Sequence, residues 1–298
     1  MIKIIEKRKT WFIISGIMVL VSILVLILWG LNFGIDFTGG SLLEVSFYTE
    51  EVPSAESVVA SLRTLEIGEV EVQPIGRENM ILRFREVDEN THQSVMQSLK
   101  ESFGAGIEER RFDSIGPSIG EELKKKSIWA TLIVIIAIIS YIAWVFRKVS
   151  KPVASWKYGI IAVIALMHDV IIVLGLFAIL GKIYSVEIDT AFVAAILTIL
   201  GYSVNDTIVV FDRTRENLAK HVEDEFEPTV ERSVKEIITR SINTSFTTLI
   251  VLFSILIFGG SSIRNFVLAL IFGVGIGTYS SIFLASPLLV VANKIFKK

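Results

Sequence analysis

The sequence predicts an α-helical integral membrane protein with six transmembrane helices and one small α+β domain facing water. Three observations support this fold class. Hydrophobic residues make up 52% of the 298 residues, more than a soluble chain of this length buries in its own core. Six apolar stretches are each long enough to cross a bilayer as a helix of about 20 residues. The region between the first two stretches has the composition of a soluble domain.

The six stretches divide the chain into three parts: residues 1–31 with the first helix, a domain at 32–126, and a five-helix region at 127–298. A signal peptide is the alternative for the first stretch, but its apolar run is too long and no A-x-A site follows it. Pro287 predicts tilt or a kink near the inner end of the last helix. We expect the spans at residues 11–31, 128–146, 158–180, 191–211, 242–258 and 266–292.

The distribution of basic residues predicts the orientation. The N-terminus, the segments 147–157 and 213–240 and the C-terminal end together carry 17 Lys and Arg, whereas the other short loops carry only Lys182 and Arg264. Lys and Arg are enriched in cytoplasmic loops. Both termini of a multi-pass membrane protein are therefore expected in the cytoplasm, with residues 32–126 outside. Lys124, Lys125 and Lys126 are the exception, but they follow a long translocated region, where the rule is weak.

The domain at 32–126 shows alternating strand and helix patterns. Strands are expected at 41–48, 69–75, 80–86 and 106–115, and helices at 54–66 and 88–103. The order β-α-β-β-α-β predicts a ferredoxin-like fold with two helices on one face of a four-stranded antiparallel sheet. His92 stands alone and the carboxylates are scattered among basic residues, so we expect this domain to bind or move against a partner.

Two carboxylates lie within predicted spans, where a central charge costs at least about 2.5–3.5 kcal/mol. Asp169, beside His168, falls near the middle of the third span, and Asp206 falls in the inner half of the fourth. A functional role and a structural hydrogen bond between helices are both open for each. Small and polar residues share the helical face of Asp206 and should face other helices or a watery cavity. They are Ser203, Tyr202, Thr198, Ala195 and Ala191.

Three further features lie in or beside the spans. Arg240 opens the fifth span before the hydroxyl-rich SINTSFTT, and snorkelling to cytoplasmic water is the alternative to a functional role. Interfacial anchoring and salt bridges are expected for Asp212, Arg213, Arg215 and Glu216. A small residue recurs every fourth position in the sixth span and predicts close helix packing. This stripe comprises Gly273, Gly277, Ser281 and Ala285.

The sequence favours no enzyme chemistry. It contains no cysteine and no Walker A, H-E-x-x-H, G-x-S-x-G or G-x-G-x-x-G motif. We therefore expect no catalytic residues, metal or cofactor, and a net charge of −2 gives no nucleic-acid footprint. An ion gradient is the expected energy source for a chain whose conspicuous groups are intramembrane carboxylates and arginine.

Five segments resemble signatures of the SecF family of the bacterial protein-export machinery. They are GIDFTGG at 34–40, SIGPSIG at 114–120, MHD at 167–169, GYSVNDTIVVFDRTREN at 201–217 and RSINTSFTT at 240–248. The segment at 201–217 is long and specific, whereas GIDFTGG is shared with the sister protein SecD. The agreement extends from the first span to the last.

The resemblance implies a six-helix half of a transporter related to the RND superfamily, located in the bacterial inner membrane, with SecD supplying the other half. It also implies association with the SecYEG channel and a translocating preprotein, and use of the proton motive force in late translocation. The family's proton-relay Asp falls on Asp206 and its Arg partner on Arg240, and Asp169 is a further relay candidate. The end at Lys298 after six spans predicts the separate-subunit form. A passive scaffold in the bilayer and an RND-like efflux unit are the alternatives.

The predicted orientation can be tested with a cysteine at Ser57. Because the chain has no cysteine of its own, Ser57→Cys gives a single thiol in the domain at 32–126. We expect an impermeant thiol reagent added outside spheroplasts to label it. Labelling only after lysis would contradict the orientation.

Overall fold

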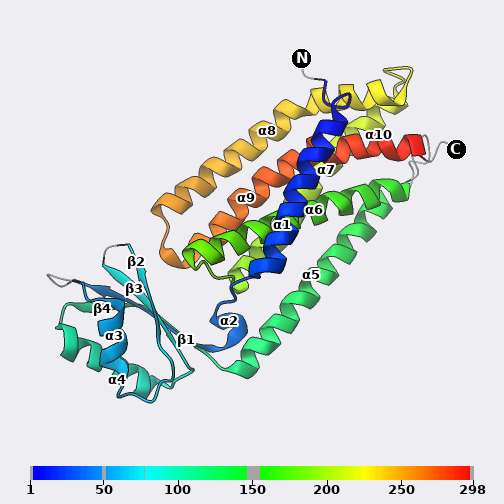
Figure 1. Cartoon of the computed structure of the whole chain (residues 1–298). Coiled ribbons are helices and arrows are strands. Elements are labelled where there is room, and N and C mark those ends of the chain that lie inside the picture. The colour runs from blue at the N-terminus through cyan, green and yellow to red at the C-terminus, as the bar shows by residue number, and fades with distance from the viewer. Residues whose placement is uncertain (1–2, 49–51, 77, 146–154, 296–298) are drawn as a thin grey trace. The chain divides into compact units, whose positions relative to one another are not determined.

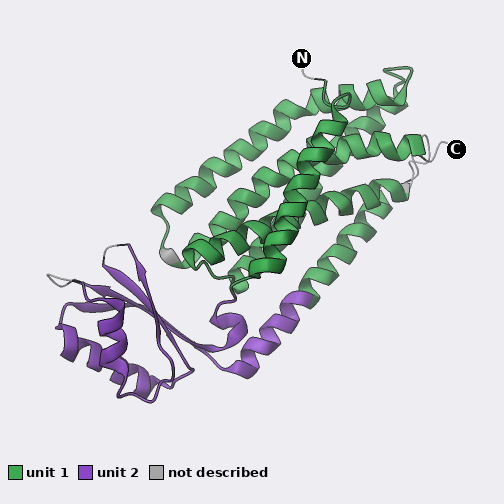
Figure 2. Ribbon diagram, viewed as in Figure 1, with its two compact units in different colours: residues 1–32, 129–298 green, residues 33–128 purple. Residues whose placement is uncertain are grey.

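A computed structural model describes residues 3–48, 52–76, 78–145 and 155–295. The chain forms two compact units, one of residues 1–32 and 129–298 and the other of residues 33–128 (Figure 2). The first unit is helical and the second is α+β. The expected domain at 32–126 covers nearly the same residues as the second unit.

The predicted fold class is confirmed. In the described part of the chain, six helices are long and apolar enough to cross a membrane (Figure 1). The last one is interrupted by a short π-helical segment, and its axis changes direction there. The helices are α1 (Arg8–Trp29), α5 (Pro117–Val145), α6 (Ser155–Tyr184), α7 (Thr190–Ala219), α8 (Phe226–Phe258), and α9 (Arg264–Ser280) continued by η2 (Ser281–Ala285) and α10 (Ser286–Ile295).

Two helices extend far beyond the expected spans. α5 begins at Pro117 rather than at 128, and α8 begins at Phe226 rather than at 242. Most of the expected loop at 213–240 is therefore helical, because this part of α8 is amphipathic: it buries Val230 and Val234 and pairs Arg232 with Glu236 one turn away on the outer face. The expected basic loop at 147–157 falls mostly outside the described residues.

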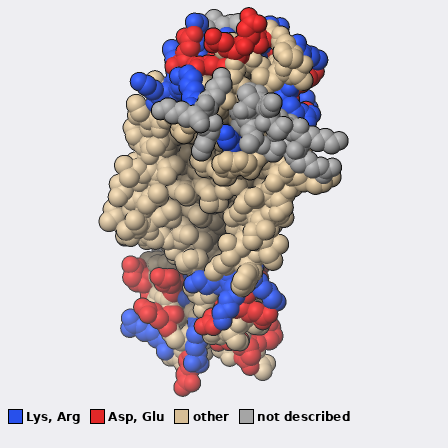
Figure 3. Space-filling view, turned by 90° about the vertical axis from the view of Figure 1, so that its right-hand side faces the viewer, with Lys and Arg blue, Asp and Glu red and all other residues tan. Residues whose placement is uncertain are grey.

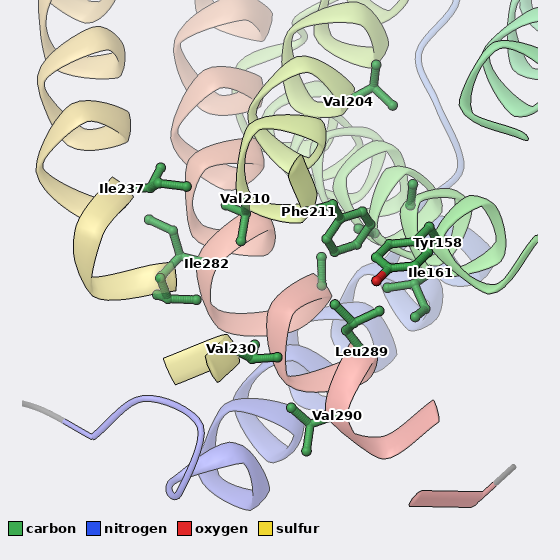
Figure 4. Close-up of a cluster of buried hydrophobic side chains, with 14 of the residues drawn as sticks. Tyr158, Ile161, Val204, Val210, Phe211, Val230, Ile237, Ile282, Leu289 and Val290 are labelled. Carbon is green, nitrogen blue, oxygen red and sulfur yellow. The ribbon is translucent and has the colours of Figure 1, made fainter. Parts of the chain in front are cut away.

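Apolar side chains from α6, α7, α8 and α10 form one buried core of the helical unit (Figure 4). Tyr158 of α6 meets Phe211 of α7 edge to face, with 5.2 Å between the ring centroids. Val230 of α8 and Leu289 of α10 belong to the same core. Burial therefore holds both α7, through Phe211, and the first turns of α8, through Val230. A second core around Phe177 and Phe192 occupies the other part of the unit.

Charged residues gather at one end of the helical unit, and the face shown in Figure 3 leaves a broad uncharged surface along the spans. At the charged end, Glu227 of α8 pairs with both Arg8 of α1 and Lys294 of α10. Glu231 accepts hydrogen bonds from the backbone N–H groups of Ile4 and Ile5, at 3.2 and 2.7 Å. The segment before α1 and the last helix therefore lie at the same end of the bundle.

Small residues bring the spans into close contact. A Cβ atom built on Gly273 of α9 would lie 2.2 Å from the side chain of Ile199 of α7, and one on Gly277 would lie 3.0 Å from Ser203. The sequence analysis did not single out Gly175 of α6, whose Cβ would lie 2.6 Å from the Cα of Ser22 of α1. Helices can approach this closely only where one side lacks a side chain.

The second unit has the predicted β-α-β-β-α-β order. It contains β1 (Gly40–Phe47), α3 (Ala55–Leu62), β2 (Glu71–Ile75), β3 (Asn79–Phe84), α4 (Glu89–Phe103) and β4 (Ile107–Ile115). The strands form an antiparallel sheet in the order β2-β3-β1-β4, as in a ferredoxin-like fold. A short helix, α2 (Ile35–Thr38), precedes β1 and was not predicted.

One face of this sheet packs on the two helices. Leu43 and Leu82, paired across β1 and β3, are fully buried with Val58 of α3 and Leu99 of α4. α4 begins after Asp88, whose carboxylate accepts the Thr91 hydroxyl at 2.7 Å and the Thr91 N–H at 3.0 Å. These two bonds hold the pKa of Asp88 below its usual value, because they stabilise the charged form.

The contact between α7 and α9 predicts a large difference between two neighbouring glycines. Gly273→Leu should lower the free energy of unfolding by about 1–3 kcal/mol or more, because the buried Ile199 cannot clear the added side chain. Gly275→Leu is the matched control, since a Cβ there meets nothing within 4 Å. Thermal melting of both purified variants tests this, and equal melting temperatures would contradict it.

Candidate functional site

Asp169 lies at the centre of a buried polar cluster of three spans. Its side chain on α6 is only 1% exposed. One carboxylate oxygen, Oδ2, accepts the hydroxyls of Ser203 of α7 at 2.5 Å and of Ser280 of α9 at 2.8 Å. The other, Oδ1, lies 2.9 Å from Nδ1 of His168. This carboxylate therefore joins α6 to both α7 and α9.

His168 completes this cluster on the side of α1. Its ring is 5% exposed and lies roughly parallel to the ring of Tyr279, with centroids 6.2 Å apart. The hydroxyl of Tyr279 in turn lies 3.1 Å from that of Ser15 of α1. The Nε2 atom of His168 is buried and has no hydrogen-bond partner among the described residues.

Asp206 forms a second, less buried cluster on α7. Its Oδ1 accepts the hydroxyl of Ser241 of α8, and its Oδ2 accepts that of Ser281 at the start of the π-helical segment, both at 2.8 Å. The residue is half-buried. Asp206 is thus held by two spans that reach it from different sides.

Consecutive serines connect the two carboxylates. Ser280 donates to Asp169 and Ser281 donates to Asp206. The regular α-helix ends between them, because the π-helical segment begins at Ser281. Pro287 follows shortly after and has no N–H for a helical bond, while Ser286 donates its hydroxyl to the Ser281 carbonyl at 2.8 Å. Interruptions of this kind are frequent at functional sites.

A chain of hydroxyls lies beside Asp206 between α7, α8 and α9. Tyr202 donates to Ser245 at 3.0 Å, and the Ser245 hydroxyl lies 2.5 Å from that of Thr278. Ser245 is one turn beyond Ser241, to whose carbonyl it also donates. The hydroxyl-rich start of the fifth span thus faces the bundle at Ser241 and Ser245, while Thr244 and Thr247 are exposed.

The structure brings together some of the predicted site residues and separates others. Asp169 and Asp206 are linked through the serine pair, but the Arg240 side chain is exposed and forms no ion pair with any described residue. Its neighbour Ser241 contacts Asp206 instead. Ser203, expected on the face of Asp206, donates to Asp169. Ser281, expected as a packing residue, bonds to Asp206.

Charged residues near the C-terminal end of α7 form salt bridges, as predicted from the sequence. Arg213 contacts Glu216 at 2.7 Å and Glu236 of α8 at 2.6 Å, and Arg215 contacts Asp212 at 2.6 Å. Sequence reasoning missed Ser280 and Tyr279, because a hydroxyl in an apolar span gives no signal until its partner is known. The stripe that includes Ser281 was visible, and Ser280 adjoins it.

The two clusters can hold protons inside the spans. An ionised carboxylate accepts hydrogen bonds only, and a protonated one also donates, so serine hydroxyls can turn to serve either state. A neutral imidazole has one nitrogen that donates and one that accepts a hydrogen bond, and both nitrogens donate when the ring is charged. The described residues contain no group of three or more His, Cys, Asp or Glu that could hold a metal ion.

Comparison with known proteins gives consistent matches. The family model "Protein export membrane protein SecD/SecF, C-terminal" matches residues 94–294, and "SecD/SecF GG Motif" matches residues 30–47. A protein translocase subunit SecF of Thermobaculum terrenum is 42% identical over 97% of this chain and 93% of its own length. A protein translocase subunit SecF of Anaerolinea thermophila is 38% identical over 98% of this chain and 94% of its own length.

A solved structure is also similar. The crystal structure of SecDF, a translocon-associated membrane protein from Thermus thermophilus, matches with a TM-score of 0.83 and 30% identity. The match covers 99% of this chain and 39% of the SecDF chain, so this chain spans well under half of that protein.

The buried hydroxyls at Asp169 predict a measurable contribution to stability. Ser280→Ala should lower the free energy of unfolding by about 1.5–3 kcal/mol, because it removes a hydrogen bond to a buried carboxylate. Ser254→Ala is the control, since the exposed Ser254 hydroxyl bonds only to its own helix. Thermal unfolding followed by tryptophan fluorescence compares them, and a Ser280→Ala protein as stable as the control would contradict this role.

Proposed function

The chain belongs to the SecF family of protein translocase subunits, and we propose that it works with SecD as a proton-driven auxiliary subunit of the Sec translocon. Membership of this family makes the chain a multi-pass membrane protein with a role in protein export. The finer proposal is that the proton motive force, acting through Asp206, Arg240 and Asp169, promotes late steps of preprotein translocation. It includes association with the SecYEG channel.

The hydroxyl cluster at Asp206 carries this proposal. A carboxylate in a span is costly and is found mainly where ions or protons are handled. Asp206 is half-buried, so it stands at the border between the bundle and its surroundings. Ser241 and Ser281 reach it from two other elements, so a change in its charge acts on several spans at once.

An uncovered polar face beside Asp206 supports a SecD partner. Asn205 of α7 and Asn243 of α8 are exposed, and their amides have no hydrogen-bond partner among the described residues. Arg240 is exposed on the same stretch of α8. Lipid cannot satisfy such groups, whereas a second polar helix bundle can. The larger SecDF relative, of which this chain spans 39%, is consistent with another chain supplying that bundle.

The exposed Arg240 fits one half of a proton cycle. An arginine near Asp206 would favour the charged carboxylate, and its withdrawal would favour the protonated one. In the described arrangement, Ser241 rather than Arg240 occupies the position next to Asp206. We assign this arrangement to the stage in which the pair is open. Movements of α8 would bring Arg240 to Asp206 and close the pair. The proposal also places both termini in the cytoplasm and residues 32–126 outside.

The proposal predicts that Asp206→Asn abolishes proton-driven stimulation of export. Asparagine keeps the size of the side chain but cannot release a proton. Its Oδ1 can still accept one serine hydroxyl, and its Nδ2 can donate to the other after that hydroxyl turns. Arg240→Met should have the same effect. The measurement is preprotein translocation into proteoliposomes or membrane vesicles with and without a proton gradient, for the full complex.

Asp212→Asn is the matched control, because Asp212 lies on the same helix and pairs only with Arg215 at the end of the span. It should retain stimulation. Full proton-dependent stimulation by the Asp206→Asn complex would show that Asp206 is structural. Proton-independent export by the wild type would instead favour a passive scaffold.

A further inference from the structure

The Asp169 cluster has an unbalanced charge unless a proton is added. Ser203 and Ser280 donate to its carboxylate but are neutral, and no Lys or Arg contacts it among the described residues. The basic residues of α1 and α10 nearest the bundle, Arg8 and Lys294, are both paired with Glu227 at the charged end. Among the described residues, His168 alone is within reach of Asp169 to supply a positive charge.

Burial strongly favours the balanced state. Asp169 and His168 are 1% and 5% exposed, and an isolated charge in such surroundings is far more costly than a hydrogen-bonded ion pair. With Nδ1 donating to Asp169, a neutral imidazole leaves a net charge of −1 in the cluster. One added proton brings the net charge to zero, either at Nε2, which makes an imidazolium–carboxylate pair, or on the carboxylate beside a neutral imidazole.

The position of Nε2 makes it the atom at which that proton enters or leaves. Nδ1 is engaged by Asp169 at 2.9 Å, whereas Nε2 has no partner among the described residues. Tyr279 is the titratable group that faces the ring from α9, and its hydroxyl is engaged with Ser15. A proton bound or released at Nε2 therefore leaves the bond between Nδ1 and Asp169 intact.

We propose that His168 and Asp169 form a second proton-holding site, which binds one proton at Nε2 of His168 and is coupled to Asp206 through Ser280 and Ser281. This inference deepens the proposed function and rests on it. Binding converts neutral imidazole and carboxylate into an imidazolium–carboxylate pair, and release reverses it, with no other bond changed. His168 is thus a proton-binding residue rather than a packing residue.

The serine pair provides the coupling. Because Ser280 and Ser281 are consecutive, a movement of one carboxylate acts on the other across a single peptide bond, at the point where the π-helical segment begins. Asp206 is also the acidic residue of α7 nearest to Ser203, which bonds to Asp169. Its negative charge favours the imidazolium, so protonation of Asp206 should promote proton release from His168.

Histidine NMR tests this directly. The chain contains three histidines, so selective ¹⁵N labelling of the full chain in lipid bilayers gives few signals. His92→Gln and His221→Gln assign them without touching the cluster. We expect the His168 signals to show the imidazolium form as well as the neutral one when the pH is varied. Asp206→Asn should change the proportion of the two forms at a given pH, and Asp212→Asn should leave it unchanged.

Two outcomes would overturn the inference. One is a wild-type His168 that shows only the neutral form at every pH, as expected if the ring only packs against Tyr279 or if Asp169 holds the proton. The other is an unchanged proportion of the two forms in Asp206→Asn, which would leave a proton site without coupling. Both readouts are independent of export: loss of proton-driven stimulation in Asp206→Asn with a neutral His168 would refute this site and leave the proposed function standing.

Discussion

A carboxylate inside a bundle of membrane spans needs its hydrogen-bond donors from the protein, and this requirement determines how four spans meet. Asp169 draws hydroxyls from α7 and α9, and Asp206 draws them from α8 and the start of the π-helical segment. Serine suits this task because its hydroxyl reaches a neighbouring helix without holding the backbones apart. The close approach at Gly273 and Gly277 places α9 near enough for these bonds to form.

The fold class could be predicted because lipid and water impose different sequence patterns. Apolar length identifies the spans, and periods of 2 and 3.6 identify the strands and helices of the α+β unit. The ends of the helices could be predicted less well, because hydropathy detects the part of a helix that lies in lipid and not its continuation into water. The first half of α8 is such a continuation, with Val230 and Val234 buried beneath a charged surface.

The site could be predicted in its carboxylates but not in their partners. An acidic residue in an apolar run is conspicuous, whereas the serine that holds it is one of many. Helical spacing placed Ser203 near Asp206, yet residues three apart differ in direction by about 60°, enough to face different helices. Small-residue spacing likewise indicated close packing at Ser281, but the hydrogen bond to Asp206 depends on how α7 lies against it.

The position of the serine pair in the last span bears on the coupling that we propose between the two carboxylates. Ser280 ends a regular helix and Ser281 begins a π-helical segment, followed at Pro287 by a residue that cannot donate a helical bond. Where the bonding pattern already changes, a shift of one residue against the next disrupts fewer bonds than in a regular helix. In the coupling that we propose, a change in charge at one carboxylate would therefore alter the geometry at the other, because they are held on opposite sides of this transition. A serine pair in the middle of α9 would bind both carboxylates rigidly.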